Sequence, residues 1–145
     1  MDMNSKYQIL AALINESRYL QSGIRDGMDA ASAAALRGTL TWMLRELESG
    51  EGEAYTLADS LGLHTDGLPP LSRLLTGGVF RVKLHFRCTD SFVAELLIRR
   101  ITESMIRVQR EVNRAEDSPG PATALLLHRF QCCTYGSVRN LQPFL

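Results

Sequence analysis

Apolar residues recur at every third or fourth position along most of this chain, and this spacing limits the fold more than any other feature. An α-helix has 3.6 residues per turn, so residues with this spacing share one face that must be buried. Three long runs follow the pattern: Leu10, Leu13, Ser17, Leu20, Ile24; Leu36, Leu40, Met43, Leu47, Ala54, Leu57, Leu61; and Val93, Leu97, Ile101, Met105, Val108, Val112. They predict an all-α protein, and a length of 145 residues fits one domain, residues 1–145.

The first two helices are predicted over residues 5–24 and 29–62. Gly23 and Gly27 are expected to end the first helix, and Asp29 to cap the second. Glycines at positions 50 and 52 interrupt the second run, yet its apolar register continues across them. We therefore predict one long helix there, with two helices joined at the glycines as the alternative.

The segment 71–88 can be interpreted in two ways. Its apolar residues alternate strictly over 81–88, as in a half-buried strand, but they also recur at helical steps. A lone strand would have no partner elsewhere in the chain, so we predict a short helix after a linker at 64–70. Two further helices are predicted: one from a cap at Thr89 or Asp90 to about residue 115, and one over 122–141. The last helix is expected to face the core with Leu126, Phe130, Cys133 and Val138.

These elements together predict an antiparallel four-helix bundle, with a short additional helix between its two helical hairpins. Three segments support a resemblance: Leu57–Gly62, Ile101–Ser104, and Leu125–Gln131 with the residues that follow to Arg139. They resemble the corresponding helices of a bacterial ferritin-like family of unknown function. The resemblance implies a ferritin-like bundle, often a homodimer, that is associated with bacterial stress responses and has no settled activity.

A ferritin-like fold raises the question of a di-iron site. Such sites use glutamates on several helices together with Glu-x-x-His pairs. Glu16, Glu53 and Glu103 lie at suitable places, but no histidine follows Glu53 or Glu103 at the third position. We therefore interpret the three glutamates as a vestigial site, solvated or paired with arginines such as Arg18 and Arg107. The alternative is a carboxylate-based protein that binds iron or another divalent metal.

Other chemistries find little support in the residues. The chain has no strained serine elbow and no phosphate-binding loop. A basic run that includes Arg81, Lys83 and Arg87 is a candidate contact for phosphates or an acidic partner. Nucleic-acid binding is not expected, since the formal net charge is zero and no reading motif is present.

The compartment is expected to be the cytoplasm. The start of the chain does not look like a secretory signal, and no apolar run is as long as a membrane span. Cys88, Cys132 and Cys133 are too few for a disulfide framework. The adjacent pair, Cys132 and Cys133, is interpreted as reduced packing residues on an apolar helix face, with a strained vicinal disulfide as the alternative.

Protein association is the function that remains. Candidate exposed apolar residues are Trp42, Tyr19, Tyr55 and residues 143–145. The tail 141–145 is expected to dock on the bundle or on a second subunit. The sequence therefore predicts a non-catalytic bundle that acts through protein association, including self-association, in a bacterial stress response. The alternatives are a metal-binding or redox protein, and an adaptor or inhibitor of another bacterial protein.

Overall fold

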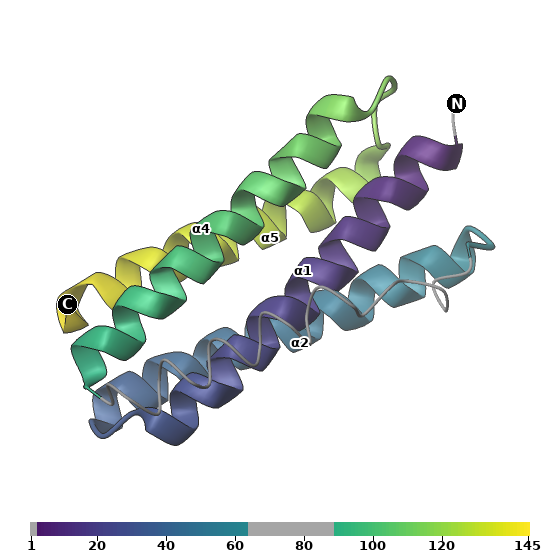
Figure 1. Cartoon of the computed structure of the whole chain (residues 1–145). Helices are drawn as coiled ribbons and strands as arrows, with labels where there is room; N and C mark the ends of the chain where they lie inside the picture. The colour runs from purple at the N-terminus through teal and green to yellow at the C-terminus, as the bar shows by residue number, and fades with distance from the viewer. Residues whose placement is uncertain (1–2, 64–88) are drawn as a thin grey trace.

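The computed structural model describes residues 3–63 and 89–145, with side chains from Ser5 onward, and these residues are helical as predicted. Figure 1 shows four long helices lying side by side, with a short 3₁₀ turn at the C-terminus. The elements are α1 (Met3–Ala30), α2 (Ala34–Ser60), α4 (Asp90–Arg114), α5 (Pro121–Leu141) and η1 (Gln142–Phe144). No strand occurs in these two ranges. The predicted linker, the helix-or-strand segment 71–88 and Arg81, Lys83 and Arg87 lie outside the described residues.

Helix α1 continues six residues beyond its predicted end at residue 24, so the prediction that Gly23 and Gly27 end it was wrong. A Cβ atom at Gly23 would lie 2.7 Å from Cδ and Nε of Arg100. One at Gly27 would lie 3.1 Å from a methyl group of Leu97. Both glycines are therefore places where α4 packs closely against α1, rather than helix ends.

Helix α2 is one continuous helix, as the unbroken register across its glycines predicted. A Cβ at Gly50 or Gly52 would meet no atom within 4 Å, so nothing in the described residues requires glycine there. The predicted start at Asp29 was wrong, because Asp29 is still in α1 and α2 begins at Ala34.

The start of α4 holds the connection between α1 and α2. Thr89 caps α4, since its hydroxyl accepts a hydrogen bond from the backbone N–H of Phe92 at 3.2 Å. Asp90 has a different role: its carboxylate accepts the N–H groups of Ser32 at 2.8 Å and Ala33 at 2.9 Å. Ala33 precedes α2 and cannot cap that helix with its own side chain, so a carboxylate from another helix fixes the turn.

Asp90→Ala should lower the free energy of unfolding by about 1–3 kcal/mol, because two hydrogen bonds to a charged acceptor are lost. Urea unfolding followed by circular dichroism measures this change. Asp59→Ala is the matched control, since Asp59 is an exposed carboxylate at the end of α2, and surface changes of this kind stay within about 0.5 kcal/mol. Equal effects of the two substitutions would contradict the proposed role of Asp90.

The core forms where the predicted apolar faces of the four helices meet. Its fully buried side chains include Leu36, Leu40, Met43, Val93, Leu97, Ile101 and Leu141, with Phe130 of α5 nearly buried. A smaller cluster lies between α1 and the second half of α2, and consists of Leu10, Ile14, Ala54 and Ala58. The apolar spacing in the sequence thus identified the buried face of each described helix.

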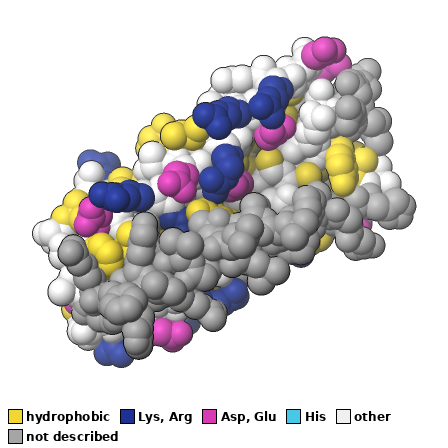
Figure 2. All heavy atoms as spheres, in the orientation of Figure 1, with side chains coloured by type: hydrophobic (Ala, Val, Ile, Leu, Met, Phe, Trp, Pro, Cys, Tyr) yellow, Lys and Arg dark blue, Asp and Glu magenta, His cyan; other side chains and the backbone are white. Residues whose placement is uncertain are grey.

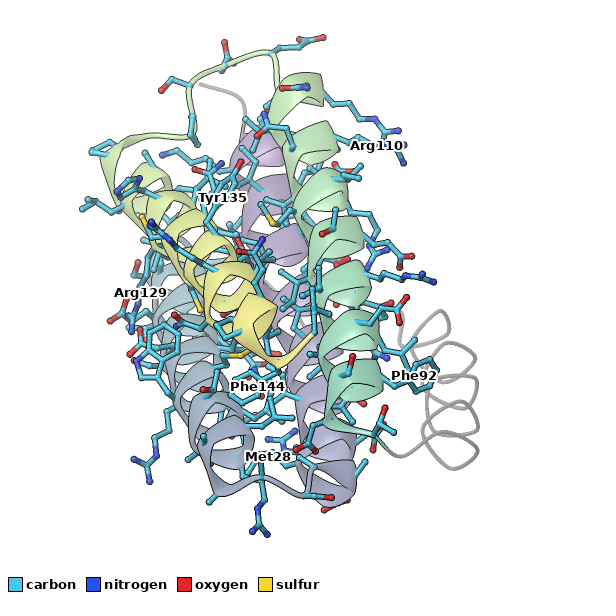
Figure 3. The ribbon with its side chains drawn as sticks, turned by 90° about the vertical axis from the view of Figure 1, so that its left-hand side faces the viewer. Met28, Phe92, Arg110, Arg129, Tyr135 and Phe144 are labelled. Carbon is cyan, nitrogen blue, oxygen red and sulfur yellow. The ribbon has the colours of Figure 1, made fainter. Side chains whose placement is uncertain are left out.

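The C-terminal tail docks in part on its own bundle. Leu141 is fully buried, and Phe144 of η1 is half-buried against the core, whereas Leu145 is exposed. Phe144 is seen beside the end of α5 in Figure 3.

Among the described helices, none combines the length and the apolar composition that a membrane crossing needs.

Candidate functional site

Glu16, the first of the three predicted metal ligands, is held by α4. Arg107 forms a short ion pair with its Oε1 and also donates to its Oε2 at 3.1 Å, while the Ser104 hydroxyl donates to Oε2 at 3.0 Å. Burial lowers the pKa of Arg107, but the hydrogen bond and charge of Glu16 and the nearby Tyr19 raise it more, so the net shift is upward. Both oxygens of Glu16 are therefore engaged by side chains of α4.

A second arginine lies deeper beside this pair. Arg100 is only 3% exposed, and its Nε and Nη2 donate to the backbone carbonyl of Tyr19 at 3.2 and 3.0 Å. The guanidinium groups of Arg100 and Arg107 lie 3.9 and 4.6 Å from the centre of the Tyr19 ring. Burial lowers the pKa of Arg100, whereas its electrostatic interactions with Tyr19, Asp26 and Glu103 raise it, and the net shift is downward. Tyr19 is itself 6% exposed, so its prediction as a surface residue was wrong.

Glu53 and Glu103, the other two predicted ligands, lie elsewhere. Glu53 is on α2, where it pairs with Arg129 of α5 at 2.7 Å, and Arg129 also donates to Ser49 at 2.9 Å. The hydrogen bond that Arg129 donates to Glu53 is the largest cause of the raised pKa of Arg129. Glu103 is exposed on α4. The structure does not bring the three carboxylates together, and within 3–63 and 89–145 no group of three His, Cys, Asp or Glu residues could hold a metal ion.

Trp42, the predicted interface residue on α2, lies at the border of α5. Its side chain is 43% exposed. A Cβ at Gly136 of α5 would lie 4.0 Å from its Cη2 atom, which places the indole ring beside that helix. Tyr55, also expected to be exposed, is half-buried and lies under the guanidinium of Arg18 at 5.0 Å.

The outer face of α5 carries the two large apolar side chains with the highest exposed fractions among the described residues. Leu125 is 71% exposed and Tyr135 is 67% exposed. His128 and Cys132 lie between them on the same face, since the steps of three, four and three residues keep one side of a helix. We define these four residues as the α5 stripe. Figure 3 looks onto α5, with Tyr135 labelled.

The α5 stripe is also poor in charge. Helix α5 holds two charged residues in 21, Arg129 and Arg139, whereas α4 holds nine in 25. Figure 2 shows basic and acidic side chains intermingled on the face where α4 lies, as expected for a surface in contact with water. Arg129 turns toward α2 to meet Glu53, which leaves the middle of the stripe without a full charge. An exposed helix face without charge is typical of a contact surface.

A shallow groove borders the stripe on the side of α4. Its volume is about 250 Å³, and its lining includes Met105 and Ile106 of α4 and Phe130 and Tyr135 of α5. Ile106 is 47% exposed. The exposed apolar surface therefore extends from Trp42 across α5 to Ile106.

The two cysteines of α5 differ in their surroundings. Cys133 is buried in the core, as predicted, whereas Cys132 is exposed, so its interpretation as a packing residue was wrong. The Sγ atom of Cys132 lies 3.4 Å from Nε2 of His128, one turn earlier on α5. Burial raises the pKa of the Cys133 thiol, against a hydrogen bond from Ser137.

The raised pKa of Cys133 predicts a loss of stability at alkaline pH. In the unfolded chain this thiol ionises near its ordinary value of 9.0, whereas the folded chain keeps its proton to higher pH. The unfolded state then binds fewer protons, so the unfolding free energy falls as pH rises through 9, by at most about 1.4 kcal/mol per pH unit. Urea unfolding between pH 8 and 10 should show this loss in the wild type and less of it in Cys133→Ala. Equal slopes in the two proteins would contradict it.

Sequence reasoning named Arg107 as a partner of the glutamates, but it missed the buried Arg100 and the α5 stripe. The sequence held a signal for the stripe, because Leu126, Phe130 and Cys133 were predicted to face inward, and the stripe is the opposite face of the same helix. Arg100 gave no comparable signal, since it lies in a charged stretch that looks solvated.

No protein-family model, no curated protein and no solved structure matches this chain.

Proposed function

We propose that this chain is a non-catalytic helical bundle that acts through protein association, and that its first partner is a second copy of itself. The observation that carries the proposal is the α5 stripe, where Leu125 and Tyr135 are both about two-thirds exposed on a face without charge. Burying such side chains against a partner releases about 25 cal/mol per Å² of apolar surface. A homodimer with twofold symmetry uses one such face twice.

The ferritin-like, antiparallel arrangement is part of the same proposal. Its support is the order of contacts: Arg18 of α1 pairs with Glu51 of α2, and Arg25 of α1 pairs with Glu48 of α2. A residue later in α1 thus contacts a residue earlier in α2, as in antiparallel helices. The same order links α1 with α4, where Glu16 pairs with Arg107 and the carbonyl of Tyr19 accepts from Arg100. The family identity, the cytoplasmic location and the role in a stress response rest on the sequence resemblance and patterns alone.

The carboxylate metal site remains the alternative function. The ion pairs of Glu16 with Arg107 and of Glu53 with Arg129 argue against a metal site. In each pair the arginine supplies the positive charge that a metal ion would otherwise supply. An ion pair already satisfies these carboxylates, so binding a metal there would require both arginines to be displaced.

Sedimentation velocity of the full chain in buffer with EDTA tests self-association. The wild type should sediment as a dimer and the double variant Leu125→Ser/Tyr135→Ser as a monomer, because serine removes the apolar side chains without touching the core. Leu145→Ser is the matched control, since it removes an exposed apolar side chain that lies outside the stripe and its groove, and it should remain a dimer. Circular dichroism checks that all three proteins are folded. A wild type that is monomeric at every concentration would contradict the proposal.

A further inference from the structure

The α5 stripe contains a pair of metal-binding side chains that no described residue completes. Cys132 and His128 are both exposed, four residues apart on one helix face, with Sγ and Nε2 separated by 3.4 Å. In a tetrahedral zinc site, bonds of about 2.3 Å to sulfur and 2.05 Å to nitrogen place these two atoms about 3.5 Å apart. The observed separation is therefore already that of two ligands on one zinc ion.

Two ligands are half of a tetrahedral site. Within the described residues no third His, Cys, Asp or Glu joins this pair in a group able to hold a metal ion. The ligands point away from the core, so the missing pair has to come from outside the described residues. A second copy would supply one more imidazole and one more thiolate, which together give a Cys₂His₂ set, one of the common structural zinc sites.

The order of residues in the stripe fits this arrangement. The stripe is symmetric about position 130: His128 and Cys132 lie two residues before and after it, and Leu125 and Tyr135 lie five residues before and after it. Two α5 helices that pack antiparallel about a twofold axis at this position would place His128 opposite the partner's Cys132. The same register places Leu125 opposite Tyr135 on both sides of the ligands. An isologous interface requires every contact to occur twice: if residue i of one subunit meets residue j of the other, then j of the first subunit also meets i of the second.

The charge distribution agrees with close contact between two such helices. Packed helices approach to about 8–10 Å, which leaves little room for unpaired charges between them. Between positions 121 and 138, α5 carries a single charged residue, Arg129, and this side chain is paired with Glu53 of α2. No like charges would therefore face one another across the twofold axis.

From this juxtaposition we infer that His128 and Cys132 form half of a zinc-type metal site that two copies of the chain complete through antiparallel α5 stripes. The inference rests on the proposed self-association. It adds the register in which the two α5 helices pack and the metal ion that they bind. Metal binding requires the thiolate form, so each Cys132 releases its proton to solvent as the metal–sulfur bond forms. Two protons should thus be released for each metal ion bound. No electron is transferred, and zinc stays divalent.

Cobalt(II) is a suitable probe, because it occupies zinc sites and shows thiolate-to-metal charge-transfer absorption that zinc lacks. The experiment uses the full chain that carries Cys88→Ser. The protein is freed of metal with EDTA and then dialysed. It is then titrated with cobalt while its absorption and its sedimentation are measured. We expect one cobalt for two chains, thiolate charge-transfer absorption, and a dimer dissociation constant at least tenfold lower than without metal. Cys132→Ser and His128→Ala should each lose the absorption and the tenfold effect. Both side chains are exposed, so the fold should not change.

The outcomes separate this inference from the proposed function. A dimer in EDTA whose absorption does not change with cobalt would overturn the metal site and leave self-association standing. One cobalt for each chain without a change in mass would overturn the shared site. A monomer under all conditions would overturn both proposals. A dimer that forms only with cobalt, and is lost in Cys132→Ser, would support the shared site and contradict association through apolar contacts alone.

Discussion

Gly23→Ala is expected to lower the free energy of unfolding by about 2 kcal/mol, although alanine normally stabilises the interior of a helix. The new methyl group would lie 2.7 Å from Cδ and Nε of Arg100, well inside van der Waals contact. Arg100 cannot swing into solvent, since it is 3% exposed and both its Nε and Nη2 are bonded to the carbonyl of Tyr19. Relieving the contact would therefore break these hydrogen bonds or push α4 away from α1.

Gly50→Ala is the matched control for this prediction. Gly50 also lies inside a long helix, but a Cβ there meets nothing within 4 Å. Alanine should then gain the ordinary helix preference of about 0.5–1 kcal/mol. Urea unfolding of the two variants should thus give changes of opposite sign. A Gly23→Ala variant as stable as Gly50→Ala would show that Arg100 does not hold α4 close to α1.

Glu16→Ala is expected to lower the free energy of unfolding by about 2 kcal/mol, because Ser104 and Arg107 would each lose the same acceptor. The full cost of breaking a buried ion pair would be larger, about 3–5 kcal/mol. Arg107 is 42% exposed, however, and can turn toward water, which reduces the cost. Glu16→Gln should cost less than Glu16→Ala, since one amide oxygen still accepts a hydrogen bond.

Glu103→Ala is the control for Glu16, and the pair of variants also bears on the metal alternative. Glu103 is exposed on the same helix as Arg107, so its removal should change stability by no more than about 0.5 kcal/mol. A vestigial site predicts a large effect at Glu16, a small effect at Glu103, and no bound iron in either protein. Metal that copurifies with the wild type and is lost in both variants would favour the carboxylate site instead.

The helices were the most predictable part of this fold. Apolar spacing identified the buried face of each described helix, and the register across Gly50 correctly predicted one continuous α2. The errors have a common physical cause. Gly23 and Gly27 look like helix ends in sequence, but they make room for side chains of another helix. Asp29 looks like the cap of α2, but it lies in α1, and Asp90 of α4 binds the turn before α2 instead. Such contacts join residues far apart in the chain, and local patterns do not contain them.

The candidate site was predictable only in part. Trp42 was predicted to be an exposed apolar residue, and it lies at the edge of the exposed apolar surface. The α5 stripe was not predicted, because apolar spacing identifies the buried face of a helix and does not show what its outer face contacts. Tyr19 was wrongly predicted to be exposed, because its ring contacts two arginines that lie about eighty residues later in the sequence.

The most direct test of self-association through α5 is an isotope-filtered NOE experiment on a mixture of ¹³C-labelled and unlabelled chains. Leu125 and Tyr135 are ten residues apart on one helix, about 15 Å along its axis, so an NOE between them cannot arise within one chain. We predict an intermolecular NOE between the methyl groups of Leu125 and the ring of Tyr135. A dimer with intermolecular NOEs at other surfaces and none between these side chains would contradict this account.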